Sequence, residues 1–176
     1  MSNTYTQIYM KKNAYSIEFT GLALGEHRFD FHIDTSLLEQ NNYHDIEGCD
    51  VDVEVILLKD ERLLTLKLNF SGKIIILCDR CLAPVDLPVD CQENVIVKIV
   101  HQNNFDNDFW EVGENEHQLN LSNVFYETIA LQRPLSIMHN IEDCNPEVIA
   151  LLQKNETEEK KLQSEESWKK KLENFL

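Results

Sequence analysis

Hydrophobic and polar residues alternate along much of the N-terminal half of the chain, with the period of a β-strand that has one buried face. Short connections such as 21–25 and 59–62 separate the alternating stretches and have the length of turns between neighbouring strands. Several antiparallel strands joined in this way predict a curled sheet or an open barrel. The alternating stretches are 15–22, 26–34, 49–58, 63–70 and 85–99.

Three local features modify this pattern. Ser36 followed by Glu39 has the spacing of a capping box and predicts a short helix over 35–41. Gly72 interrupts a long apolar run, which predicts either a bulge or a turn to another strand. The stretch 85–99 fits either a pair of strands or one long, bent strand.

The pattern changes in the second half of the chain. Residues 102–118 are acidic and polar with isolated aromatic side chains, which predicts a long loop. In 119–134 the apolar residues follow a helical period, Asn120 or Ser122 can cap the first turn, and Pro134 ends the helix. The fold class expected is therefore α+β, mainly an antiparallel sheet with a few helices late in the chain.

The composition of the C-terminal residues predicts the domain organisation. We expect a single α+β domain over 1–149, a charged linker over 150–163 and an amphipathic helix over 164–176. The apolar stripe of that helix could lie in the groove of a partner protein, or it could pack on the protein's own sheet, and the sequence leaves both readings open. The stripe residues are Trp168, Leu172 and Phe175.

The chain is strongly acidic, with 31 Asp and Glu residues against 16 Lys and Arg residues and a formal net charge of −15. Such a surface repels phosphate backbones, so direct RNA binding by the acidic body is disfavoured. A basic partner such as a ribosomal protein would be attracted. The alternative is that the acidity only keeps the protein soluble.

Neither an apolar stretch of membrane-spanning length nor a signal-peptide pattern is present in the sequence. We therefore expect a cytoplasmic protein that makes no membrane contact. In that reducing environment the five cysteines are thiols or metal ligands rather than disulfide partners.

Cys78 and Cys81 form a C-x-x-C pair directly after a predicted strand, which is the spacing that directs two thiolates at one tetrahedral metal ion. His139 and Cys144 offer a second pair at a spacing suited to zinc. These four residues predict a structural zinc site. Arg80 lies beside the first pair and would lower the pKa of its thiols.

Two other interpretations of these cysteines stay open. They could be a reduced thiol cluster that holds no metal, or a thioredoxin-type redox couple, although no helical pattern begins at Cys78 to lower its pKa. Cys49 and Cys91 continue strand patterns and are interpreted as core residues, with Cys91 as a reserve ligand. Neither a phosphate-binding loop nor a hydrolase or metalloprotease motif is present, so we expect no enzymatic activity.

The residues around the cysteines resemble the YceD family, whose members are known as large ribosomal RNA subunit accumulation proteins. The resemblance extends over roughly residues 10–176, and its specific part is a C-x-R-C-L motif followed by a helix that ends at a proline, a Cys/His pair and a short C-terminal tail. The matching positions are Cys78, Arg80, Cys81 and Leu82, then Asn120, Leu121, Leu131 and Pro134, then His139, Cys144, Trp168 and Leu172.

The resemblance implies a non-enzymatic factor that supports the synthesis, processing or stability of large-subunit ribosomal RNA. Family genes commonly neighbour the gene of a small large-subunit ribosomal protein. The implied partner is therefore a ribosomal protein or a pre-ribosomal particle of the large subunit, with no small-molecule substrate. The rival functions are a thiol- or zinc-dependent redox protein and a generic acidic protein-interaction module.

Overall fold

The structure is a computed structural model that describes residues 14–43, 45–100 and 110–155. The chain divides into two compact units. The first contains the described residues up to Ile76 together with Asp86–Pro134. The second contains Leu77–Val85 and the described residues from Leu135 onward.

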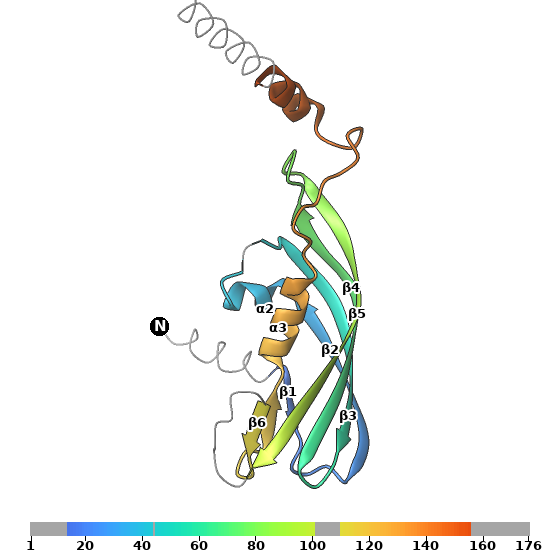
Figure 1. The fold of residues 1–176 in the computed structure, drawn as a ribbon, viewed down its shortest axis with the longest axis vertical. Helices are drawn as coiled ribbons and strands as arrows, with labels where there is room; N and C mark the ends of the chain where they lie inside the picture. Colours follow the sequence, from blue (N-terminus) through green and yellow to red (C-terminus); the bar gives the residue numbers. More distant parts are fainter. Residues whose placement is uncertain (1–13, 44, 101–109, 156–176) are drawn as a thin grey trace, which may run out of the picture. The chain divides into compact units, whose positions relative to one another are not determined.

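The first unit is built on a five-stranded sheet in the order β2-β3-β4-β5-β6 (Figure 1). Strand β3 pairs antiparallel with both β2 and β4, whereas β5 and β6 run parallel. A separate two-stranded sheet pairs β1 antiparallel with β7. The strands are β1 (Ser16–Glu18), β2 (Gly25–Asp34), β3 (Gly48–Lys59), β4 (Leu63–Leu77), β5 (Pro84–Val100), β6 (Trp110–Gly113) and β7 (Gln118–Asn120).

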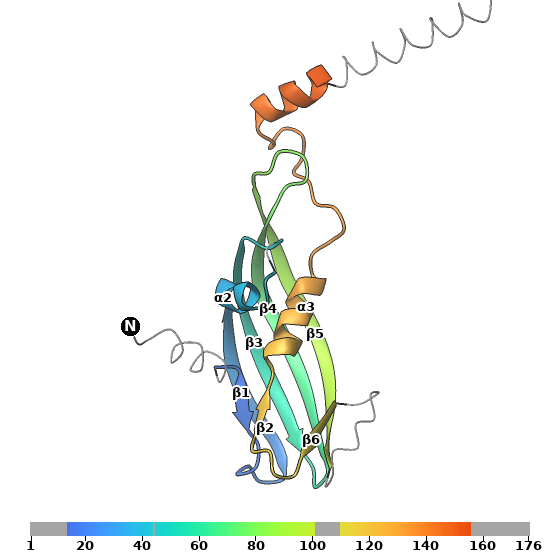
Figure 2. The same cartoon turned by 90° about the vertical axis from the view of Figure 1, so that its left-hand side faces the viewer.

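These elements confirm the predicted α+β class and the mainly antiparallel sheet, but the expected barrel or strongly curled sheet was wrong. The five-stranded sheet is open, with β2 and β6 at its edges. Helices α2 (Thr35–Gln40) and α3 (Ser122–Leu131) lie on the same face of this sheet (Figure 1 and Figure 2). They cover the apolar face, so the sheet does not need to close on itself to bury that face.

Other local predictions had mixed outcomes. The stretch 85–99 lies within one long strand, β5, and the described part of the expected loop at 102–118 contains strand β6. Asp34 caps α2 in place of Ser36, because the Asp34 carboxylate accepts hydrogen bonds from both the backbone N–H and the hydroxyl of Ser36. None of the helices in the described ranges has the length and hydrophobicity needed to cross a bilayer.

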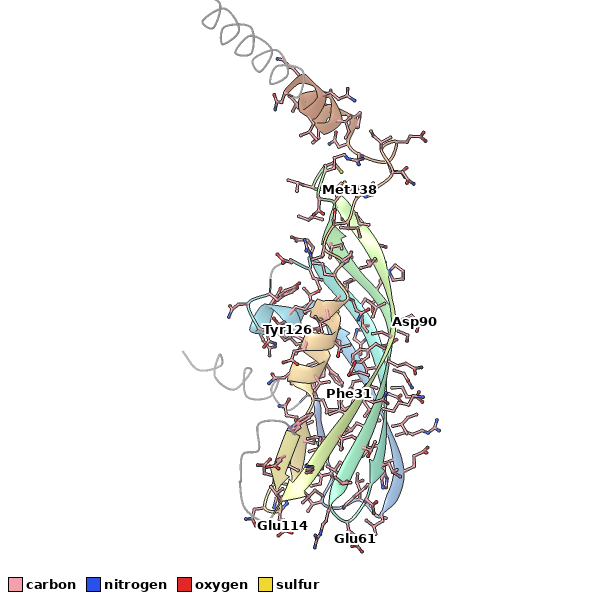
Figure 3. All side chains as sticks on the ribbon, viewed as in Figure 1. Phe31, Glu61, Asp90, Glu114, Tyr126 and Met138 are labelled. Carbon is pink, nitrogen blue, oxygen red and sulfur yellow. The ribbon has the colours of Figure 1, made fainter. Side chains whose placement is uncertain are left out.

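The core of the first unit is aromatic where α3 meets the sheet. Phe125 of α3 is fully buried, and its ring centroid lies 5.8 Å from that of Tyr15, 5.4 Å from that of Phe31 and 5.9 Å from that of Phe70. Phe31 is labelled in Figure 3 on the strand beneath this helix. The edge-on geometry of these rings stabilises the contact beyond the burial of their area. This unit therefore has a core of its own.

Gly72 marks a close approach of two strands rather than the predicted bulge or turn. The pairing of β3 with β4 passes through Gly72 without interruption, with Gly72 opposite Val51. Gly72 has a φ of +154°, and a Cβ atom there would collide with the carbonyl oxygen of Asp50 and lie 2.7 Å from the Cα of Val51. Because both contacts are with backbone atoms, only glycine fits at this position.

We expect Gly72→Ala to destabilise the protein by about 2–4 kcal/mol, because it adds backbone strain and a clash with the neighbouring strand. Urea denaturation followed by circular dichroism measures the loss. The matched control is Gly21→Ala, because a Cβ at Gly21 meets no atom within 4 Å. Equal midpoints for the two variants would contradict the close approach of β3 and β4 at Gly72.

Candidate metal centre

The connection between β4 and β5 is a tight loop that holds two thiols. The backbone N–H of Cys78 donates to the carbonyl of Ala83, and that of Leu82 donates to the carbonyl of Cys78, both at 2.9 Å. Inside the loop, the backbone N–H of Arg80 donates to the sulfur of Cys78 at 3.4 Å. These bonds close the turn between Cys78 and Cys81, which is why a C-x-x-C spacing brings two sulfurs to one place.

The segment after Pro134 supplies the other two groups of the cluster. The backbone N–H of Asp79 donates to the carbonyl of Ile137, and the N–H of Ile137 donates to the Asp79 carboxylate, both at 2.9 Å. This double contact holds the segment against the loop. It places Nδ1 of His139 3.5 Å from the sulfur of Cys81.

His139 is also oriented by its second ring nitrogen. Its Nε2 lies 3.2 Å from the carbonyl oxygen of Pro84. A carbonyl only accepts hydrogen bonds, so this contact assigns the proton to Nε2 and leaves the lone pair of Nδ1 facing the thiols. A histidine that ligates a metal through one nitrogen typically donates from the other in this way.

The ligand atoms of Cys78, Cys81, His139 and Cys144 all lie within 4.8 Å of one another. A tetrahedral zinc ion with bonds of about 2.0–2.3 Å requires its ligand atoms to be roughly 3.5 Å apart, so a small contraction would close the cluster around an ion. The structure thus brings together all four residues that the sequence singled out. Such a set could hold a metal.

The three cysteines form the buried centre of the second unit, and partly buried apolar side chains surround them. Two of these come from the helix at 146–155 and two from the end of the C-x-x-C loop and the start of β5. The surrounding residues are Ala83, Val85, Val148 and Ile149.

Hydrogen bonds lower the pKa of two of the thiols. Burial raises the pKa of Cys78, but bonds from backbone N–H groups, that of His139 foremost, outweigh burial and lower this pKa to about 6. Bonds from backbone N–H groups, that of Asn145 foremost, likewise lower the pKa of Cys81. The thiolate is the form that binds a metal, so both groups suit that role.

The other two groups respond to the negative charge that collects around the first pair. Burial and the neighbouring thiols raise the pKa of Cys144, and the hydrogen bond to Cys81 raises the pKa of His139. A cation among the four groups would reverse the cost of ionising Cys144. Ionised thiols thus give the cluster an excess of negative charge, which a bound cation would neutralise.

The contacts that Arg80, Asp79 and the Pro84 carbonyl make with this centre could not be predicted from the sequence. The sequence places Arg80 beside the C-x-x-C pair, but its guanidinium contacts the sulfur of Cys144 at 3.7 Å and that of Met138 at 3.4 Å. The contribution of Asp79 and the Pro84 carbonyl depends on backbone pairing that residue type does not reveal.

The remaining predicted site residues lie elsewhere. Cys49 is buried on β3, where burial raises its pKa to about 12, and Cys91 is half-buried on β5. Neither belongs to the cluster formed among the described residues. The expected partner-binding residues Trp168, Leu172 and Phe175 lie outside the described residues, as does the expected helix over 164–176. Of the expected linker, 150–155 is the end of the helix at 146–155.

The family model of the large ribosomal RNA subunit accumulation protein YceD matches residues 66–176, which include all four residues of the cluster. The chain belongs to the YceD family. This match confirms the resemblance seen in the sequence. Comparison with curated proteins and with solved structures gives no significant match.

In this YceD-family chain the turn of the C-x-x-C loop carries one strained residue. Leu82 has a φ of 57°, a left-handed conformation that costs a residue with a Cβ atom about 1–2 kcal/mol. Among the described residues Asn42 is the other non-glycine residue with positive φ, and asparagine tolerates this region far better than leucine.

We expect the thiols of metal-free protein to ionise in the order of their pKa values. The pKa of Cys78 should be near 6 and that of Cys49 near 12. Because both side chains are buried, an alkylating reagent would report their accessibility, so the ultraviolet absorbance of the thiolates is compared across pH 5–9 in wild type and Cys78→Ser. The absorbance missing from Cys78→Ser should have a midpoint near pH 6. A midpoint of about 8.5, the ordinary value, would show that the N–H bonds to Cys78 do not form without metal.

Proposed function

We propose that Cys78, Cys81, His139 and Cys144 bind one zinc ion that stabilises the second unit. The donor chemistry supports this choice, because thiolates with one imidazole suit zinc whereas calcium and magnesium take oxygen ligands. Four protein donors leave no coordination position for water or substrate, and this closed donor set is the observation on which the proposal mainly rests. Bound zinc would supply a structural crosslink and no reaction.

On this basis the protein is a non-enzymatic accessory factor of ribosome biogenesis that acts in the cytoplasm. The family description names the accumulation of large-subunit ribosomal RNA. We infer that this chain supports the synthesis, processing or stability of that RNA. The closed metal site agrees with such a role, because a structural site positions a binding surface rather than a substrate.

The partner we propose is a basic ribosomal protein or a pre-ribosomal particle of the large subunit. On the exposed side of β2 and β3, Asp34 lies opposite Asp50 and Asp30 lies opposite Glu54. Arg28 contacts Glu54 and His32 contacts Asp50, so these cations offset part of the negative charge. The remaining excess of carboxylates would attract a cationic partner. This acidic surface does not suit direct RNA binding. The tail over 164–176 would add a second contact through Trp168, Leu172 and Phe175.

A thiol redox protein is the rival function, and the lowered pKa of Cys78 favours it. The two functions differ in the state of the thiols. A redox couple needs Cys78 to be reactive in the protein as purified, whereas a zinc site protects it until the metal is removed.

The test of the function is the ratio of mature large-subunit to small-subunit ribosomal RNA in cells that lack this chain. We expect the ratio to fall on deletion, to recover with wild type and with Cys91→Ser, and to stay low with Cys144→Ser. Cys91 is the matched control because it lies outside the cluster. Quantitative hybridisation of total RNA measures the ratio. Full recovery with Cys144→Ser would refute a role for the metal site, and an unchanged ratio on deletion would refute the role in ribosomal RNA.

A further inference from the structure

Leu82 has a left-handed backbone conformation that glycine adopts much more easily than leucine. Its left-handed conformation, with a φ of 57°, turns the chain after Leu82 so that the carbonyl of Ala83 accepts from the N–H of Cys78, while the Leu82 N–H donates to the carbonyl of Cys78. Glycine makes the same turn without strain. The backbone therefore gives no reason for a leucine here.

The side chain of Leu82 is mostly exposed, so its packing does not compensate for this strain. It is 70% exposed, whereas Ala83, the next residue, packs against the cysteines. Leucine is thus worse than glycine for the isolated protein, both in conformation and in exposed apolar surface. Strain that the fold does not use points to a functional constraint.

A second apolar side chain is exposed beside the same centre. Met138, labelled in Figure 3, is 52% exposed and precedes the cluster residue His139. The Arg80 guanidinium contacts the sulfur of Met138 at 3.4 Å and that of Cys144 at 3.7 Å. Arg80 therefore links Met138 to the cluster residue Cys144, and the loop hydrogen bond links Leu82 to Cys78.

We propose that Leu82 and Met138 form a docking site for a basic ribosomal protein of the large subunit, with Leu82 inserted into an apolar pocket of that protein. The proposal rests on the proposed function and names the residues that meet the partner. Methionine is enriched at protein interfaces and adapts well to a partner surface, and the closed loop holds Leu82 in a fixed position.

The charges of the second unit decide which kind of partner fits. Its described acidic residues outnumber the basic pair Arg80 and Lys154. A unit with this excess of acidic residues attracts a basic protein and repels both the phosphates of RNA and a second copy of this acidic chain. The acidic residues are Asp79, Glu142, Asp143 and Glu147.

The experiment compares wild type with Leu82→Gly in zinc-loaded, full-length protein. The probes are the protein fraction extracted from purified large ribosomal subunits and, separately, protein-free large-subunit ribosomal RNA. We expect wild type to retain a basic protein from the first probe, and Leu82→Gly to bind that protein at least about 10-fold more weakly. Its zinc content should be unchanged and its melting temperature equal or higher, because glycine removes the strain.

Two further variants sharpen the result. Met138→Gln should weaken retention as well, because it replaces an exposed apolar group without changing the loop. Leu131→Gln is the matched control and should bind like wild type, because Leu131 is an 81% exposed leucine at the end of α3 in the first unit.

Each alternative outcome has a distinct meaning. If Leu82→Gly binds the ribosomal protein as tightly as wild type, the docking site is overturned while the proposed function stands. If wild type retains no protein of the large subunit, the proposed partner and the docking site both fail. If wild type binds the RNA and Leu82→Gly weakens that binding, Leu82 contacts RNA and the protein partner is wrong.

Discussion

The second unit depends on a single constraint, which is that four groups able to ligate a metal stay within 4.8 Å of one another. Among the described residues of this unit, the buried centre consists of Cys78, Cys81 and Cys144, and four partly buried apolar side chains pack against it. Burial of this size offsets only part of the conformational entropy of ordering two separate segments of chain. Lowered thiol pKa values add negative charge at the same place. A divalent cation removes both problems, because it neutralises the charge and crosslinks the segments.

The first unit has a different source of stability. Its sheet buries continuous apolar faces, and Phe125 anchors α3 to that sheet through a cluster of aromatic rings. Such a core needs no metal. The two units can therefore respond differently to a chelator, with a lower free energy of unfolding expected for the unit built on cysteines. The first unit presents acidic residues on its sheet, while the second presents apolar residues beside its cluster of cysteines and His139.

Sequence periodicity identified the long strands because each of them buries one face, and ligand spacing identified all four residues of the cluster. Hydrophobic periodicity does not indicate whether the two edge strands of a sheet pair with each other, so the open sheet was mistaken for a curled or closed one. Strand β6 was missed because it has only four residues, too few for a period to be recognised, and pairing with β5 makes it a strand. The cap at Asp34 and the strain at Leu82 depend on backbone geometry that residue type does not reveal.

The most direct measurement is zinc K-edge X-ray absorption on full-length protein purified without chelator or affinity metal, together with the zinc content per chain. We predict about one zinc per chain, bound by three sulfurs at about 2.3 Å and one nitrogen at about 2.0 Å. Protein that lacks zinc, or zinc with fewer than three sulfur ligands or with an oxygen ligand, would contradict the assignment of Cys78, Cys81, His139 and Cys144 as a closed structural site.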